Sequence, residues 1–238
     1  MATAHGDGLI GEQPCRIAGA GTPRPSVECR DLAERLLTPG QVREVAAAMP
    51  PRYRVLVLAA AWSGLRQGEL LTLTRADHDL DAIPPVVRVR RRVRRNDDGS
   101  MDVDTPKSTA SVRTVALPGP LRDAFVDHLA RFALEDAGSL VFATSRGTVP
   151  ARSNLTEMLH HATAAAGVPT IRFHDLRHCA QVLAAESGAT LAELMARMGH
   201  STPHAAQVYM HARAERDRAL ADALGAAISA DGSLCLGS

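Results

Sequence analysis

The chain has 238 residues, of which 45% are apolar and 22% are charged, and its formal net charge is only +1. This length is enough for one core or a core with a small appendage, and a surface that binds nucleic acid must come from local clustering of basic residues. The apolar runs are too short to span a bilayer, no secretory signal precedes them, and the four cysteines form no C-x-x-C pair, so we expect a cytoplasmic protein with reduced thiols.

The N-terminal third of the sequence contains three predicted helices. Residues 1–37 are rich in Gly, Pro and Ala without a sustained period, which indicates a linker or the remnant of a preceding domain. A first helix begins after Thr38, because Gln41 stands at the spacing of a capping box. A second helix over residues 52–64 is apolar nearly all round, which predicts that it is buried. A third is predicted over residues 66–74.

The period then changes from helical to alternating. In residues 85–95 the valines Val87, Val89 and Val93 share one parity, and the arginines Arg88, Arg90, Arg92 and Arg94 share the other. This alternation predicts a strand with one basic face. A turn signal at residues 96–100 and a second strand-like run at 111–118 follow. We therefore expect a small antiparallel sheet across about residues 86–117.

The rest of the chain is predicted to be helical. The expected helices cover residues 120–135, 153–166, 175–187, 190–198, 203–210 and 213–227. Gly167 and Gly199 are typical C-terminal stops, and residues 190–193 form another capping box. The buried stripe behind it is expected at Leu191, Leu194, Met195 and Met198. The fold class is thus α+β and mainly α-helical, with a small sheet against a helical bundle and a flexible tail at 229–238.

A short polar motif, "HDLRH", begins the helix predicted near residue 175. Its spacing places His174, Arg177 and His178 on one helical face. A zinc peptidase motif would read H-E-x-x-H, with Asp175 here in the position of the base. The permanent charge of Arg177 opposes a cation on that face, however, and two imidazoles with a guanidinium suit a phosphate better. Alternatively, His178 is an ordinary half-buried histidine that orients its neighbours.

Three further places carry matching chemistry. Arg66 and Glu69 share a helical face, where a simple surface ion pair is the alternative. Lys107 stands on a turn before a strand, where a solvated lysine is the alternative. His200 precedes Tyr209 by nine residues, and a lone tyrosine on a helix is usually a packing residue.

Together these residue types suit phosphoryl transfer without a metal. Two arginines can neutralise the oxygens of a phosphodiester as charge builds in the transition state. A tyrosine hydroxyl can attack phosphorus, although its pKa of about 10 requires help from nearby cations or a histidine base. A lysine can protonate the leaving oxygen.

Residues 37–211 resemble the catalytic domain of tyrosine recombinases, the phage integrase family. The motifs that carry the resemblance are "GLRQGELLTL", "TPKSTASVRTVALP", "HDLRH", "MGHS" and "YMH". The resemblance implies roles for seven residues: Arg66 and Arg177 clamp the scissile phosphate, Lys107 protonates the leaving 5′ oxygen, His174 assists proton transfer, His200 binds the phosphate, Tyr209 is the nucleophile and Glu69 orders the pocket. His178 supports them.

The resemblance also implies the domain plan and the partners. Residues 38–228 would form the catalytic domain, and residues 1–37 would be what remains of an N-terminal core-binding domain. The enzyme would act on double-stranded DNA as a homotetramer, without a cofactor, a metal or a membrane. The basic strand would contact the DNA backbone through Arg88, Arg90, Arg92 and Arg94, or else remain a solvated face. The alternative functions are a DNA-binding remnant without recombination activity and a zinc hydrolase built on "HDLRH".

Overall fold

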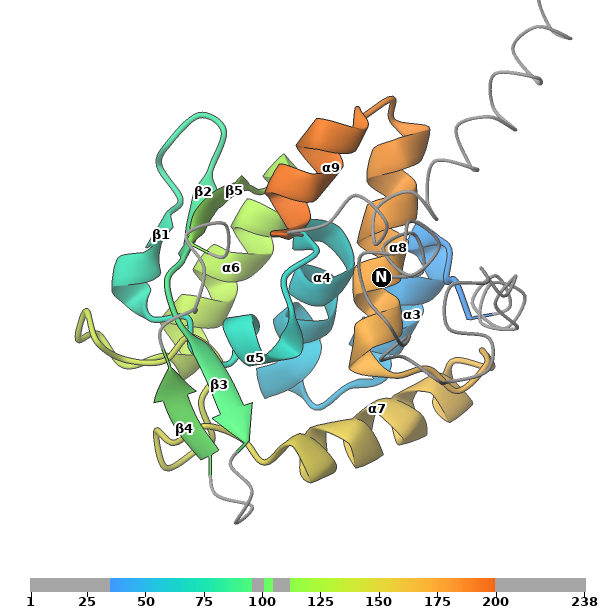
Figure 1. Cartoon of the computed structure of the whole chain (residues 1–238). Helices are drawn as coiled ribbons and strands as arrows, with labels where there is room; N and C mark the ends of the chain where they lie inside the picture. The colour runs from blue at the N-terminus through green and yellow to red at the C-terminus, as the bar shows by residue number, and fades with distance from the viewer. Residues whose placement is uncertain (1–34, 96–100, 105–111, 200–238) are drawn as a thin grey trace, which may run out of the picture. The chain divides into compact units, whose positions relative to one another are not determined.

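The computed structural model describes residues 35–95, 101–104 and 112–199, which form a mainly helical domain with a small antiparallel sheet (Figure 1). Its helices are α3 (Pro39–Ala48), α4 (Arg54–Ser63), α5 (Gln67–Leu70), α6 (Gly119–Phe132), α7 (Arg152–Ala165), α8 (Phe173–Glu186) and α9 (Leu191–Met198). Its strands are β1 (His78–Asp79), β2 (Val86–Val89), β3 (Arg92–Arg95), β4 (Met101–Asp104) and β5 (Arg113–Ala116), and two 3-10 turns span Pro51–Tyr53 and Arg75–Asp77. The predicted fold class is confirmed. The helices expected at 203–210 and 213–227 and the tail at 229–238 lie outside the described residues.

Helix α4 is the centre of this domain. It packs against α3, α6 and α8, which surround it in Figure 1. Leu56 and Val57 are fully buried, and small residues from Ala59 to Ala61 allow neighbouring helices to approach closely. The prediction of a buried helix is therefore confirmed. The helix ends at Gly64, which adopts a φ of 72°.

The sheet is divided in a way that the alternating pattern did not predict. Strand β2 lies between β1 and β5 in one antiparallel sheet, while β3 and β4 form a separate hairpin. The expectation of one continuous strand is wrong because the chain turns away between Val89 and Arg92. There the hydroxyl of Thr72 donates a hydrogen bond to the carbonyl of Arg91 at 2.9 Å. The side chain of Arg91 contacts Asp77. These contacts join Arg91 to a segment distant in sequence, and they take the place of the strand-to-strand hydrogen bonds expected there.

Helix α5 is much shorter than predicted. It has four residues, because the backbone beyond it bonds to another part of the chain. The amide of Val141 donates to the carbonyl of Leu73 at 2.8 Å, and the amide of Arg75 donates to Ser139 at 3.1 Å. A helix over residues 66–74 would lose both bonds.

Local sequence signals correctly predict where several helices begin and end. Both predicted capping boxes form, one from Thr38 with Gln41 and one from Thr190 with Glu193. Helix α8 begins two residues before residue 175, since Arg172 is its N-cap. Positive φ angles at Gly167 and Gly199 confirm the two stops.

The stripe expected on α9 is confirmed in part. Leu194 and Met198 are buried, whereas Leu191 and Met195 are half-exposed in the described structure. Of the helices in the described part of the chain, none is long and apolar enough to cross a membrane.

Candidate active site

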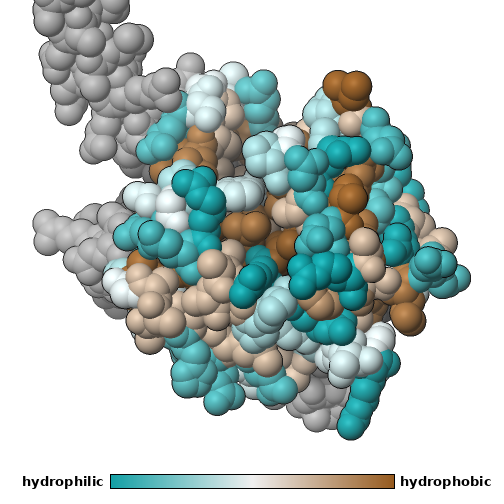
Figure 2. All heavy atoms as spheres, turned by 180° about the vertical axis from the view of Figure 1, so that it is seen from behind, coloured by the Kyte–Doolittle hydropathy of each residue, from teal (hydrophilic) through white to brown (hydrophobic). Residues whose placement is uncertain are grey.

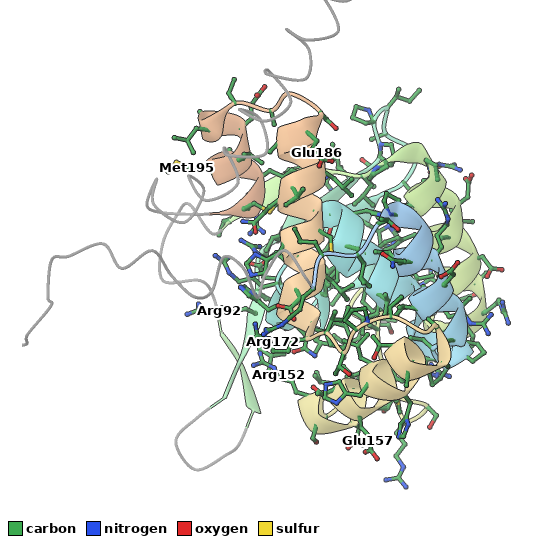
Figure 3. All side chains as sticks on the ribbon, turned by 90° about the vertical axis from the view of Figure 1, so that its right-hand side faces the viewer. Arg92, Arg152, Glu157, Arg172, Glu186 and Met195 are labelled. Carbon is green, nitrogen blue, oxygen red and sulfur yellow. The ribbon has the colours of Figure 1, made fainter. Side chains whose placement is uncertain are left out.

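A polar cavity of about 320 Å³ lies where four segments of the chain meet. It is lined by Arg66, Gln67, Gly68, Glu69, Arg92, Val93, Arg152 and His174. Those residues come from α5, β3, the start of α7 and the start of α8. Figure 3 shows the labelled side chains of Arg92, Arg152 and Arg172 gathered near the start of α8. The structure therefore brings four of the predicted site residues into one cavity: Arg66, Glu69, Arg92 and His174.

A larger groove of about 800 Å³ lies elsewhere, between β5, α8 and α9. Alanine is the most frequent residue in its lining, and its charged residues are Glu193, Arg113 and Arg197. None of the predicted site residues that the structure describes lines this groove. Figure 2 shows that the face behind the view of Figure 1 mixes hydrophilic and hydrophobic residues without one dominant patch. The smaller cavity is therefore the candidate active site.

Arg66 is fixed in this cavity by Glu69. Its backbone amide donates to one carboxylate oxygen of Glu69 at 2.9 Å, and its Nη1 donates to the other at 2.9 Å. Its Nη2 donates to the carbonyl of Gly199 at 3.2 Å. The side chain of Arg66 is 39% exposed while that of Glu69 is 3% exposed, so the carboxylate is a buried anchor for a guanidinium that faces the cavity.

A second arginine completes the anchor and was missed by the sequence analysis. Arg113 on β5 donates from Nη1 and Nη2 to the two oxygens of Glu69 at 3.1 and 2.9 Å. Its Nε donates to the carbonyl of Arg197 at 2.8 Å. Arg113 shares the strand parity of buried Val115. An arginine at an inward position of a strand was the signal that could have revealed it.

The charge of Glu69 follows from these contacts. Burial alone would raise the pKa of its carboxyl, but hydrogen bonds and charge from Arg113 and Arg66 outweigh burial and hold the pKa below its ordinary value. The carboxylate therefore stays ionised near neutral pH. The ion pair of Arg66 and Glu69, which the sequence offered as the simpler alternative, is present. It is not a surface pair, because Glu69 is deeply buried.

Arg177 is almost completely buried, at 2% exposure. Its Nη1 donates to the carbonyl of Gly64, and its Nη2 donates to the carbonyl of Met198 at 2.7 Å. These carbonyls lie at the C-terminal ends of α4 and α9, where the helix dipoles are negative. Two helix ends thus supply acceptors for this buried guanidinium.

The two histidines of the motif contact each other. The ring centroids of His174 and His178 are 4.5 Å apart in an edge-to-face arrangement. Burial, His178 and Arg177 lower the pKa of His174 to about 4, so its imidazole is neutral near pH 7. The Nδ1 atom of His178 lies 3.0 Å from the side-chain oxygen of Gln181. His178 is thus a half-buried, hydrogen-bonded histidine, and its supporting role stays a prediction.

Asp175 has a structural part in the motif. It is fully buried, and it accepts hydrogen bonds from the amide and the Nη2 atom of Arg172 at 2.8 and 3.1 Å. A carboxylate held in this way caps α8 and is not free to activate a water molecule. Among residues 35–95, 101–104 and 112–199, the structure has no group of three His, Cys, Asp or Glu side chains that could hold a metal ion. The hydrogen bonds that hold Asp175 weigh against the zinc alternative.

Three of the four arginines expected on the basic strand have described side chains, and these lie in different surroundings. Arg88 pairs with Asp79 at 3.4 Å, and Arg90 lies 3.9 Å from Asp77. Arg92 lines the candidate site. The side chain of Arg94 lies outside the described residues. Because the strand breaks after Val89, these arginines do not continue along one strand face.

Comparison with known proteins identifies the family. The profile of the phage integrase family matches residues 35–216, most of the chain. The chain belongs to the phage integrase family.

Relatives within the phage integrase family support this assignment. A prophage phiRv2 integrase of Mycobacterium tuberculosis is 45% identical over 225 residues, which cover 93% of this chain and 57% of that protein. The integrase of Mycobacterium phage L5 is 36% identical, covering 94% of this chain and 59% of the relative. The chain thus spans somewhat more than half the length of these integrases.

Solved structures show the same integrase fold. The Tn1549 transposon integrase, in complex with transposon right end DNA, has a TM-score of 0.63 at 22% identity, over 76% of this chain and 65% of that one. XerA recombinase has a TM-score of 0.61 at 21% identity, over 76% and 61%. In this phage integrase domain, Lys107, His200 and Tyr209 lie outside the described residues, so their predicted roles remain predictions.

Proposed function

We propose that this integrase carries out site-specific recombination of double-stranded DNA by cleaving and rejoining strands through a 3′-phosphotyrosyl intermediate. The observation that carries the proposal is the placement of Arg66, which a buried carboxylate fixes while its guanidinium faces a cavity shared with His174. Family membership gives this cavity its substrate class. The names of the relatives, integrases and recombinases, and the transposon DNA bound to one solved neighbour support DNA as the partner.

The chemistry assigned to the cavity begins with charge neutralisation. Arg66 binds a non-bridging oxygen of the scissile phosphate, and charge on that phosphate grows as phosphorus becomes pentacoordinate. Arg177 lies close enough to His174 for its charge to depress the pKa of that imidazole, and it adds positive potential from below the surface. His200 donates a hydrogen bond to the same phosphate. We assign no metal to the reaction, because the guanidinium groups supply the positive charge.

Proton transfers complete the reaction. The hydroxyl of Tyr209 loses its proton, which neutral His174 is able to accept, and the phenolate oxygen forms a bond to phosphorus. The bond from phosphorus to the 5′ oxygen breaks, and Lys107 donates a proton to that oxygen. Reversal with a different 5′ hydroxyl joins the exchanged strand. One phosphoester replaces another at each step, so no nucleotide cofactor is needed.

The proposal also covers the assembly on DNA and one alternative function. Strand exchange between two duplexes requires four cleavages, which a homotetramer on DNA would supply. A chain that binds DNA without recombination remains the alternative, because the whole-length relatives contain further sequence beyond the match.

A covalent-trapping assay tests the proposed function. The protein is incubated with a nicked suicide duplex that carries a candidate attachment site, with EDTA present. We expect a covalent adduct of protein and DNA that is absent in Tyr209→Phe. Salt-sensitive retardation of DNA without an adduct would support the DNA-binding alternative. Cleavage that EDTA abolishes and zinc restores would support a hydrolase instead.

A further inference from the structure

The candidate site contains more positive charge than one phosphate can use. A phosphodiester carries a single negative charge, and a second develops only in the transition state. Arg66 and Arg177 already match this charge in the proposed reaction. Arg92 and Arg152 line the same cavity, and neither takes part in that reaction.

The carboxylate at the cavity does not balance these two arginines. Glu69 is the one acidic residue among the described residues that line it, and both of its oxygens accept hydrogen bonds from Arg66 and Arg113. The Nε atoms of Arg92 and Arg152 are buried and have no hydrogen-bond partner among the described residues. A guanidinium donor that is removed from water without a hydrogen-bond acceptor costs free energy. The arrangement therefore favours the binding of an anion in the cavity.

The head of Arg152 is held in a defined position. Arg152 is the first residue of α7, and its Nη2 donates to the carbonyl of Val93 on β3 at 3.0 Å. A Cβ atom added to Gly68 would lie 2.8 Å from that Nη2 and 2.9 Å from that carbonyl oxygen. Glycine at this position therefore lets the guanidinium and β3 lie directly against α5. Figure 3 shows Arg152 and Arg92 near each other where α8 begins.

We propose that Arg152 and Arg92 form a second phosphate-binding subsite, which takes a non-scissile phosphate of the DNA strand that Arg66 contacts. The proposal rests on the proposed function, because that function makes DNA the ligand. A DNA strand carries one charge per about 3.4 Å along the helix axis, so a neighbouring phosphate accompanies every scissile one. Contacts of this kind fix the register of the backbone without reading bases. The subsite would thereby set which phosphate reaches Arg66.

Salt dependence of DNA binding tests the subsite. Affinity for a duplex of arbitrary sequence is measured over a series of salt concentrations for the wild type, Arg152→Gln and Arg152→Lys. The logarithm of the association constant falls linearly with the logarithm of the salt concentration. Each lost phosphate contact makes that slope less steep by about one. We expect that decrease in Arg152→Gln, with affinity at fixed salt reduced roughly tenfold, and a slope near that of the wild type in Arg152→Lys.

A matched control removes the same charge elsewhere. Arg131 on α6 is 58% exposed and pairs with Asp127, so Arg131→Gln changes net charge equally without touching the cavity. Thermal melting without DNA checks that each variant is folded. If Arg152→Gln fails to fold, Arg92→Gln replaces it and is expected to give the same decrease in slope.

The outcomes separate the subsite from the proposed function. Equal salt slopes for the wild type and a folded Arg152→Gln or Arg92→Gln variant, or the same change in Arg131→Gln, would overturn the subsite even if the wild type forms its tyrosyl adduct. A less steep salt dependence in the cavity variants supports the subsite even if no adduct forms. In that case the proposed reaction is wrong and the subsite stands.

Discussion

At the scale of single residues, Glu69 determines how the candidate site is built. Its two oxygens receive donors from Arg66 and Arg113, so one buried carboxylate fixes the guanidinium that faces the cavity and ties β5 to α5. A buried ion pair of this kind contributes little net stability compared with an apolar replacement, but removal of one partner leaves buried charge uncompensated.

We predict that Glu69→Gln destabilises the domain by about 3–5 kcal/mol at neutral pH, because the buried charge of Arg113 then loses the carboxylate of Glu69. The pKa of Glu69 is lower in the folded than in the unfolded protein, so its stabilising effect is present above its ordinary value of 4.5 and is lost as pH falls through the folded pKa. Urea denaturation across a pH series should show the gap between the wild type and the variant narrowing below pH 4.5.

A surface carboxylate provides the control for that measurement. Glu157 on α7, labelled in Figure 3, has a side chain that is 76% exposed. Glu157→Gln should change the free energy of unfolding by less than about 0.5 kcal/mol at every pH. A Glu69→Gln variant as stable as this control would contradict the anchoring role.

At the scale of elements, Gly68 decides how closely β3 approaches α5. The carbonyl of Val93 is a backbone atom and cannot turn away from an added Cβ as a flexible side chain can. Gly68→Ala should therefore cost roughly 1–3 kcal/mol through overpacking. It should also weaken DNA binding, because the guanidinium of Arg152 must move.

Gly119 is the matched control for the Gly68 substitution. It begins α6, and a Cβ added there meets no atom within 4 Å. Gly119→Ala should be neutral or stabilise the domain by up to about 1 kcal/mol, since alanine lowers the entropy of the unfolded chain. Thermal melting of both variants measures the difference. Equal melting temperatures would show that β3 has room to shift.

The same scale explains which elements the sequence could predict. Capping boxes predict helices α3 and α9, and apolar composition predicts α4. These signals lie within the helices or next to them, so the sequence alone reveals them. The short α5 and the break between β2 and β3 depend on hydrogen bonds to residues such as Ser139 and Thr72 that are distant in sequence. A local pattern contains no information about such partners.

The candidate site divides in the same way. Arg66, Glu69 and His174 stand in motifs that are readable from the sequence, and they do share one cavity. Arg152 stands in no motif, and Arg113 stands in one without a role assigned to it. The place of both at the site depends on how β5 and α7 pack. Their charges become visible only when the fold brings separate segments together.

At the scale of the whole molecule, Arg177 connects the helices on which the site depends. From α8 it bonds the last turns of both α4 and α9. Removal of its side chain leaves buried carbonyl groups without donors and opens a cavity. We predict that Arg177→Ala loses roughly 2–5 kcal/mol of stability as well as adduct formation.

Arg177→Lys separates the two losses. Lysine keeps the positive charge, but its single ammonium group cannot reproduce the planar fork that reaches both carbonyls. Urea denaturation should place its stability between those of the wild type and Arg177→Ala, and the trapping assay measures its cleavage. Wild-type stability in Arg177→Ala would show that the helix ends find other donors.

The acceptors of Arg177 have a consequence for laboratory evolution of this chain. Its Nη1 and Nη2 atoms donate to main-chain oxygen atoms, at Gly64 and Met198, and every amino acid carries such an atom. A library randomised at position 198 would keep the acceptor in every variant whose residue fits the buried space beside Gly64. A library randomised at position 177 would lose both bonds in nearly every clone. Sequence diversity should therefore be introduced around this arginine and not at it.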